Sequence, residues 1–198
     1  MTYRHRFIKR TFDIFLASFT LLIFFPIIIL ASLCIKLGEG GDIFFIQERV
    51  GKDGKLFNIY KFRTMRQKQD STSTVTVSGD ARVTTIGSFL RRWKLDELPQ
   101  LWNVVTGDMS FVGPRPDVPG YADCLSGDDR ILLAIRPGIT GPATLKYRNE
   151  EELLAQQDDP ETFNREVVFP DKVKINKEYI KNYGFFKDLK YILMTIVK

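Results

Sequence analysis

The sequence predicts an α+β fold, predominantly helical, with an N-terminal re-entrant membrane helix-break-helix and a small cytosolic domain. Three observations support this: an uncharged run from Ile14 to Ile35, strand-like alternation between Asp42 and Arg63, and later apolar residues at helical spacing. We assign residues 1–38 to the membrane helix. Residues 39–198 form a membrane-associated cytosolic domain with a β-hairpin and interfacial amphipathic helices.

The uncharged run is long enough to cross a bilayer, which takes roughly 20 apolar residues, and is too long for a signal peptide. Pro26, after Phe25, should break the helix because it removes a backbone hydrogen bond. Basic residues on both flanks fit a single crossing poorly. We therefore favour a re-entrant helix with both ends in the cytosol over a spanning one. The flanking cations are Arg4, Arg6, Lys9 and Arg10 before the run, and Lys36, Arg49, Lys52, Lys55 and Lys61 after it.

Composition limits the chemistry open to the chain. Lysine and arginine exceed aspartate and glutamate by only 29 to 24, at a pI of about 9.2. We expect no nucleic-acid partner from so small an excess, which fits an anionic membrane surface or a polyphosphate substrate. His5 is the single histidine, and Cys34 and Cys124 are expected to be reduced thiols. Any acid, base or nucleophile should therefore be a carboxylate, a lysine or a hydroxyl.

The segment from Asp42 to Arg63 is typical of a β-hairpin, with a turn at Gly51–Gly54. Alternation along the second strand predicts Lys61 and Arg63 on one face. Two adjacent cations suit a phosphate, although a pair of solvated charges is the favoured interpretation when the pair is taken alone. The polar stretch from Arg66 to Arg82 is expected to be a mobile loop or lid.

Two short amphipathic helices should follow the loop. Ile86 to Trp93 has helical spacing and carries Arg91 on another face. Leu95 to Val105 gives a second stripe, and Pro99 fits only in a first turn, which predicts Asp96 near the N-cap. There the helix dipole should keep its carboxylate ionised, and the same helix end attracts phosphate. An ordinary N-cap is the alternative for this aspartate.

The remaining segments are two proline-glycine loops and further helices. Gly113–Pro116 should hold Arg115 in a rigid turn, because two prolines fix the backbone around it. The acidic stretch from Glu150 to Glu161 is expected to be a surface helix. A basic amphipathic helix is predicted from Tyr179 to the end of the chain, lying either in the membrane interface or on the domain core.

Six ordered motifs resemble the small monotopic phosphoglycosyl transferases, also called bacterial sugar transferases, over nearly the whole chain. They are Lys9-Arg10-Thr11-Phe12-Asp13, Gln47-Glu48-Arg49-Val50-Gly51, Tyr60-Lys61-Phe62-Arg63-Thr64-Met65, Leu95-Asp96-Glu97-Leu98-Pro99-Gln100-Leu101, Gly107-Asp108-Met109-Ser110-Phe111-Val112-Gly113-Pro114-Arg115-Pro116 and Arg136-Pro137-Gly138-Ile139-Thr140-Gly141.

The resemblance implies an enzyme of the bacterial cytoplasmic membrane whose catalytic domain faces the cytoplasm. Such enzymes use Mg²⁺, a UDP-sugar and a polyprenyl phosphate, typically undecaprenyl phosphate, and they release UMP through an aspartyl-phosphosugar in a ping-pong mechanism. They begin the membrane stage of glycoconjugate assembly, such as polysaccharide biosynthesis. The resemblance also implies a helix broken at a proline like Pro26, although the preceding residue is usually serine and here is Phe25. Its catalytic dyad corresponds to Asp96 and Glu97, and its basic residues to Lys61, Arg91, Arg115 and Arg148.

We assign nucleophilic attack to Asp96 and metal binding to Glu97, with Asp96 as a second candidate ligand. Three alternatives stay open: a membrane-anchored binding protein, a metal-dependent glycosyltransferase, and direct transfer with Asp96 as a base. The second usually carries an Asp-x-Asp motif, which this sequence lacks. The sugar is not specified by these motifs, and a homo-oligomer is left open.

Overall fold

Helices predominate in the computed structural model, which describes residues 3–66 and 82–197. This confirms the predominantly helical α+β class, whereas the predicted lid falls almost wholly outside the described residues. The elements are α1 (Tyr3–Glu39), β1 (Phe44–Val50), η1 (Lys52–Gly54), β2 (Leu56–Phe62), α2 (Thr85–Arg92), η2 (Leu95–Glu97), α3 (Gln100–Thr106), β3 (Ser110–Val112), η3 (Ala122–Cys124), η4 (Gly127–Ala134), β4 (Gly138–Thr140), α4 (Pro142–Lys146), α5 (Glu150–Ala155), α6 (Pro160–Phe163), η5 (Asn164–Val168), α7 (Phe169–Lys181) and α8 (Phe185–Ile196).

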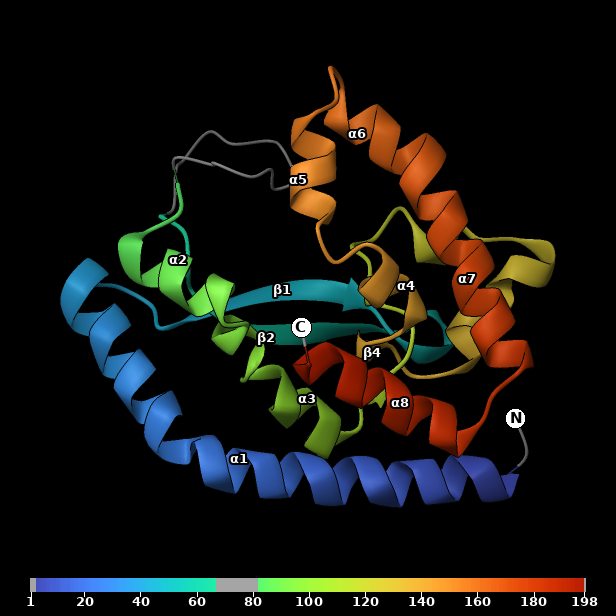
Figure 1. Cartoon of the computed structure of the whole chain (residues 1–198), viewed down its shortest axis with the longest axis horizontal. Helices are drawn as coiled ribbons and strands as arrows, with labels where there is room; N and C mark the ends of the chain where they lie inside the picture. The colour runs from blue at the N-terminus through green and yellow to red at the C-terminus, as the bar shows by residue number, and fades with distance from the viewer. Residues whose placement is uncertain (1–2, 67–81, 198) are drawn as a thin grey trace.

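Helix α1 is continuous for 37 residues and bends, so the predicted break is a bend within one helix. Figure 1 shows a long first limb beneath the domain and a second limb that rises along its side. Pro26 lies inside this helix and removes one backbone hydrogen bond, which accounts for the bend. Beyond it, the Ser32 hydroxyl donates to the Ile28 carbonyl at 2.7 Å. The re-entrant topology in a bilayer stays a prediction.

Both limbs of α1 pack against the same folded body. On the first limb, Ala17 is fully buried among core residues of β2 and α3. On the second limb, Ala31 and Ile35 pack against Phe62 and Leu90. A straight helix crossing a bilayer could not make both sets of contacts, because its two ends would diverge from the domain.

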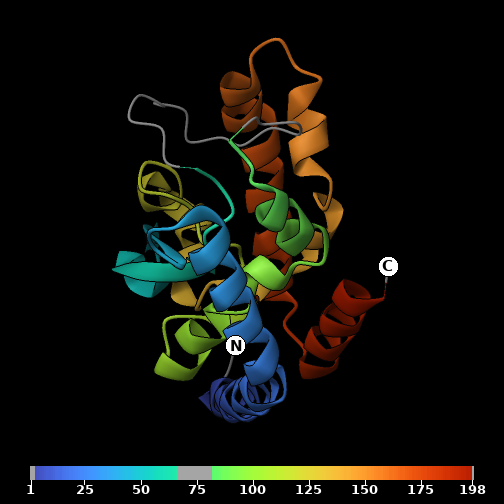
Figure 2. The same cartoon turned by 90° about the vertical axis from the view of Figure 1, so that its left-hand side faces the viewer.

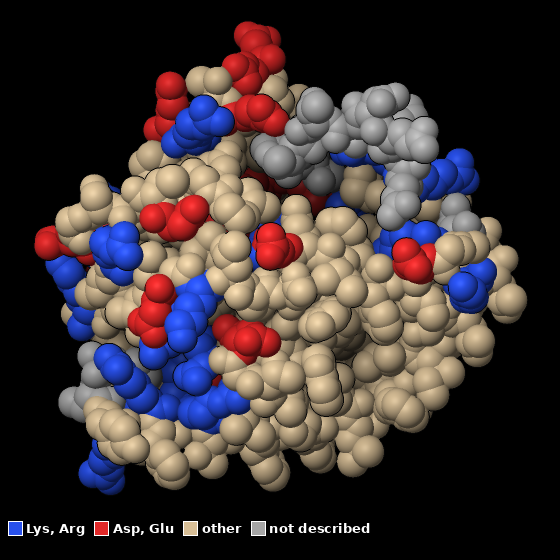
Figure 3. All heavy atoms as spheres, turned by 180° about the vertical axis from the view of Figure 1, so that it is seen from behind, with Lys and Arg blue, Asp and Glu red and all other residues tan. Residues whose placement is uncertain are grey.

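The opposite face of α1 is apolar and exposed. Phe15 is 71% exposed, Leu22 74% and Leu30 62%. This helix is long and apolar enough to cross a membrane by length and composition. Figure 3 shows the lower edge of the molecule, along α1, as a broad surface largely without charged side chains. Exposed apolar area of this extent is typical of a membrane contact.

A labelling experiment tests the topology that these contacts favour. Arg4→Cys, in a background without Cys34 and Cys124, should resist an impermeant maleimide in sealed cells and react after permeabilisation. The same behaviour is expected for Lys174→Cys, which lies on α7 in the domain. Labelling of position 4 from outside, with position 174 protected, would mean that α1 crosses the membrane.

The predicted hairpin is confirmed: β1 and β2 are antiparallel, from Phe44 opposite Phe62 to Val50 opposite Leu56. A second small sheet joins the two proline-glycine loops, with β3 and β4 parallel. The backbones approach so closely that a Cβ at Gly138 would lie 2.1 Å from the Gly113 nitrogen. This contact requires glycine and fixes the turn that carries Arg115.

The C-terminal prediction needs one correction, because Tyr179 belongs to α7 and the last helix begins at Phe185. Helix α8 lies beside the first limb of α1 in both Figure 1 and Figure 2. One face of α8 is packed, with Asp188 2% exposed, while Phe186 is 83% exposed and Leu193 61%. The packed face confirms the alternative of a helix on the domain core, and a membrane contact of the exposed face stays a prediction.

Candidate active site

The neighbouring carboxylates Asp96 and Glu97 lie on η2, a single tight turn between α2 and α3. Lys94, just before the turn, adopts a left-handed conformation with φ of 56°. Helix α3 begins only after Pro99, so Asp96 is not its N-cap and makes no capping hydrogen bond. An ordinary N-cap was the alternative for Asp96 and is wrong, because a separate turn precedes the helix.

Asp96 is buried, at 8% exposure, and its Oδ1 has no hydrogen-bond partner. Burial raises its pKa, and the charge of Glu97 raises it further. The nearby charges of Lys61, Lys94 and Arg91 oppose this rise without cancelling it. The carboxylate is thus poorly solvated rather than stabilised by a helix dipole, and a poorly solvated anion is a reactive one.

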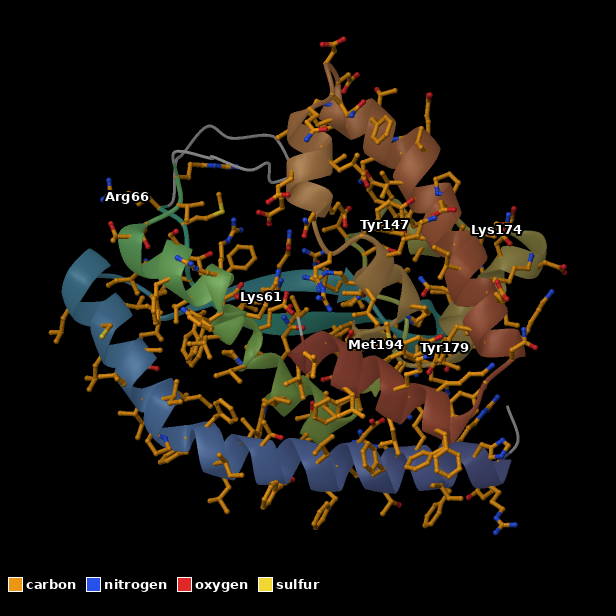
Figure 4. The ribbon with its side chains drawn as sticks, viewed as in Figure 1. Lys61, Arg66, Tyr147, Lys174, Tyr179 and Met194 are labelled. Carbon is orange, nitrogen blue, oxygen red and sulfur yellow. The ribbon has the colours of Figure 1, made fainter. Side chains whose placement is uncertain are left out.

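Glu97 is clamped by two cations that contact the same oxygen. Its Oε1 accepts from Lys61 Nζ at 3.0 Å and from Arg115 Nη2 at 2.6 Å. Burial alone would raise the pKa of Glu97, but the charges and hydrogen bonds of Arg115 and Lys61 outweigh it and hold the pKa far below its ordinary value. Glu97 is therefore ionised, and it in turn raises the pKa of Arg115. Figure 4 shows Lys61 in the middle of the domain.

The other predicted basic residues are only partly brought together. Arg91 donates to the Thr64 hydroxyl at 3.2 Å, and its charge acts on Asp96. Arg63 lies beyond the end of β2 and donates to the Gly40 carbonyl, away from Lys61. Arg148 donates to the Met194 carbonyl of α8 at 2.5 Å. The structure therefore groups Lys61, Arg91 and Arg115 around the dyad, and places Arg63 and Arg148 in other contacts.

A hollow of about 690 Å³, open to solvent, adjoins the dyad through Arg115. The Lys172 ammonium bridges both oxygens of Glu150 at 2.6 and 2.7 Å. Burial raises the pKa of Asp117 to about 6. We call this the Arg115 hollow; its polar lining includes Arg49, Arg115, Asp117, Tyr121, Glu150 and Lys172.

Sequence reasoning gave no role to most of this lining. Arg49 belongs to the Gln47–Gly51 motif, and its buried Nε has no hydrogen-bond partner. Asp117 follows the Arg115 turn directly, so its position next to a functional arginine was the available signal. Glu150 and Lys172 come from separate helices and are brought together only by the tertiary fold.

The dyad can accept a divalent cation together with a ligand. No group of three or more His, Cys, Asp or Glu side chains suited to a metal occurs among the described residues. Mg²⁺, however, is usually held by one or two carboxylates plus substrate phosphates and water. Asp96 Oδ1 is unpartnered, and among the described residues no donor bonds Glu97 Oε2. These two oxygens fit Mg²⁺ that arrives with a phosphate substrate.

Comparisons with known proteins show which family the chain resembles. A family model described as bacterial sugar transferase matches residues 4–198. The exopolysaccharide production protein ExoY of Rhizobium meliloti is 33% identical over 95% of this chain and 83% of its own length. The UDP-glucose:undecaprenyl-phosphate glucose-1-phosphate transferase of Escherichia coli is 36% identical over 98% of this chain and 40% of its own. A UDP-N-acetylgalactosamine-undecaprenyl-phosphate N-acetylgalactosaminephosphotransferase of Aeromonas hydrophila is 34% identical, and this chain spans 43% of its length.

Proposed function

Because the chain belongs to the bacterial sugar transferase family, we propose that it transfers a sugar 1-phosphate from a UDP-sugar to a polyprenyl phosphate, with release of UMP. The observation that carries the proposal is the dyad itself: a buried carboxylate with an unpartnered oxygen stands beside a carboxylate clamped by two cations. Relatives named for transfer to undecaprenyl phosphate make that lipid the expected acceptor. The product would begin the assembly of a membrane-linked glycoconjugate.

The donor is proposed to bind with its diphosphate at Arg115 and Lys61 and the rest of the molecule in the Arg115 hollow. Arg115 contacts Glu97 and also lines the hollow, so it connects the two. A guanidinium can bind phosphate oxygens through two parallel hydrogen bonds. Asp117 and Glu150 offer acceptors to sugar or base, and Arg49 and Lys172 offer donors.

In the first half-reaction, an oxygen of Asp96 attacks the phosphorus that bears the sugar. The bond from this phosphorus to the bridging oxygen breaks, and UMP leaves with that oxygen and the electron pair. Asp96 must be ionised to attack; burial and the charge of Glu97 oppose this, and the charges of Lys61, Lys94 and Arg91 favour it. Glu97, with Asp96 as a second candidate, would hold Mg²⁺, which would neutralise charge on the phosphate oxygens.

In the second half-reaction, an oxygen of the lipid phosphate attacks the same phosphorus, and the Asp96 carboxylate leaves with its electrons. The product is a polyprenyl diphosphate sugar, and Asp96 is regenerated. Helices α2 and α3 flank η2, and Phe89 on α2 is 58% exposed, Trp93 directly after α2 is 62% exposed and Trp102 on α3 is 56% exposed. Exposed tryptophans are typical of the membrane interface, so these side chains favour a dyad at the depth of the lipid phosphate.

The proposal is tested by UMP release from a panel of UDP-sugars, with and without polyprenyl phosphate. Release of UMP with one sugar in the absence of lipid, limited to about one equivalent per enzyme, supports transfer through Asp96. UMP release that strictly requires lipid would instead favour direct transfer with Asp96 as a base. A protein that binds UDP-sugars without ever releasing UMP would contradict the transferase.

Arg115→Lys should lower kcat/KM by about ten- to hundred-fold while the fold survives. Lysine keeps the charge but loses the planar pair of donors for Glu97 and phosphate. UMP release kinetics measure the loss, and Arg130→Lys, an exposed site that bonds only the Leu125 carbonyl among described residues, is the matched control. Unchanged kinetics in Arg115→Lys would remove Arg115 from the donor site.

A further inference from the structure

A second hollow, of about 410 Å³ with its open mouth included, lies where the first limb of α1 meets β3 and the end of η4. None of its lining residues belongs to the dyad or to the Arg115 hollow. Figure 3 shows a dense group of Lys and Arg side chains on the rear face, just above the uncharged lower edge. We call this the basic hollow; its charged lining is Arg6, Lys9, Arg10, Asp13, Lys52 and Arg136.

Two arginines of the basic hollow are held by carbonyl groups rather than by carboxylates. Arg10 donates to the carbonyls of Val104 at 2.6 Å and Val105 at 3.0 Å. Arg136 donates through Nε to the Gly107 carbonyl at 2.6 Å. Burial lowers the pKa of Arg10, and the charge of Arg136 lowers it further, so the two guanidiniums stand close together. Carbonyls orient both groups without neutralising them, and for Arg10 the charges of Asp13 and Asp108 offset only part of the effect of burial and of Arg136.

The carboxylates near the basic hollow are already engaged. Asp13, the one carboxylate among its described lining, is 2% exposed. It accepts from the Ser110 hydroxyl at 2.7 Å and from the Phe111 backbone at 3.2 Å. Lys9 is paired with Asp188, and Asp108, whose charge also acts on Arg10, accepts from Thr106. Among the described residues, the terminal nitrogens of Arg136 and the whole guanidinium of Arg6 have no partner. Lys52 is paired with Asp53 at 3.4 Å, so the positive charge that remains at the mouth is mainly that of Arg6 and Arg136.

The basic hollow and the exposed apolar face lie on opposite sides of the first limb of α1, about one helix diameter apart. Arg6 and Arg10 line the hollow, whereas Phe15, 71% exposed, and Phe19, 52% exposed, lie on the other side of the helix. A helix is about 10 Å across, and an amphipathic helix in the interface buries its apolar face about 5–10 Å into the headgroup–acyl boundary. With the phenylalanines in the acyl region, the arginines stand at the depth of phospholipid phosphates.

We propose that the basic hollow binds the phosphate of an anionic phospholipid headgroup, with Arg6 and Arg136 as the main donors and Lys52 at the rim. Guanidinium groups match phosphate oxygens in geometry and charge, and the adjoining apolar face accepts the acyl chains. The uncompensated charge selects an anionic headgroup over a zwitterionic one. This inference does not depend on the transfer reaction.

The test uses the full chain in neutral detergent, titrated with dihexanoylphosphatidylglycerol or dihexanoylphosphatidylcholine and followed by native mass spectrometry. We call the anionic phosphatidylglycerol the glycerol lipid and the zwitterionic phosphatidylcholine the choline lipid. The glycerol lipid should bind more tightly than the choline lipid. Arg6→Gln with Lys52→Gln should weaken its binding by about five-fold per charge, roughly 25-fold together. Both positions lie outside the buried hydrogen bonds of the hollow, so the fold should survive. Arg136→Gln should weaken binding independently, and Lys174→Gln with Lys181→Gln, two substitutions on α7, is the matched control.

Three results would overturn the proposal. The first is equal binding of the two lipids to the parent protein. The second is that the glycerol lipid binds equally well to the parent, to the Arg6→Gln/Lys52→Gln double variant and to Arg136→Gln, or that the Lys174→Gln/Lys181→Gln control loses as much affinity as these variants do. The third is complete displacement of the glycerol lipid by an equal concentration of inorganic phosphate, which would identify a site for free phosphate instead.

Discussion

Asp96→Asn is expected to abolish UMP release and lipid product together, by about four orders of magnitude or more. The amide keeps the shape of the side chain but loses the charge and the nucleophilic oxygen. Because Asp96 Oδ1 is buried without a partner, the substitution removes no hydrogen bond of the fold through that atom. The effect should therefore appear in the reaction and not in the stability of the protein.

Intact-protein mass spectrometry makes this expectation specific. Incubation with the correct UDP-sugar and Mg²⁺, without lipid, should add the mass of one phosphosugar, mapped to Asp96. Glu97→Gln should retain some adduct but require more Mg²⁺. Asp171→Asn changes a carboxylate paired with Lys146 on the surface and should behave like the parent. Full lipid-product formation by Asp96→Asn would rule out the covalent step and favour Asp96-independent or ternary-complex transfer.

The second large effect is expected in stability. Lys9 lies 2.6 Å from Asp188, which also accepts from the Tyr179 hydroxyl at 2.6 Å, and both members of the ion pair are buried. Lys9→Met leaves the Asp188 carboxylate buried without its cation, which costs about 3–5 kcal/mol. For a chain of this size the melting temperature should fall by about 6–20 °C. Thermal unfolding in neutral detergent measures the change.

The chain contains its own control for this pair. Lys146 lies 2.6 Å from Asp171, which accepts from the Tyr147 hydroxyl at 2.7 Å, so the same three residue types meet at the surface. The lysine side chain there is 56% exposed, and water replaces the lost partner. Lys146→Met should lower the melting temperature by less than about 4 °C. Equal losses in the two variants would mean that burial does not strengthen the Lys9 pair.

The parts of the fold that could be predicted are those fixed by short-range patterns. Alternation and a glycine-rich turn predicted the hairpin, and helical spacing predicted α2. The separate turn at Asp96 could not be predicted in this way. A 3-10 helix of three residues shows the same apolar spacing in the sequence as the first turn of an α-helix. Alternation also failed for Arg63, since β2 ends at Phe62 and the face is no longer defined beyond it.

In the candidate site too, short-range patterns could be predicted and contacts between distant segments could not. Asp96 and Glu97 are adjacent and were found through a motif, whereas Lys61 and Arg115 reach Glu97 from separate segments. The motifs named these residues, but only the packing of β2 and the Arg115 turn shows that both cations contact one oxygen. For α1, the sequence predicted a disturbance at Pro26 but not that both limbs would pack on the domain, which keeps the helix continuous.

The contact between Lys9 and Asp188 joins positions 179 residues apart, nearly the two ends of the chain. During synthesis α1 leaves the ribosome well before α8. At a synthesis rate of about 5–20 residues per second, Asp188 is added roughly 10–40 s after Lys9. Over that interval lipid is available to the long apolar face of α1, while Lys9 still lacks the carboxylate of Asp188. The order of synthesis therefore lets α1 insert into the bilayer first, and the domain then completes its folding against a helix that is already in the membrane.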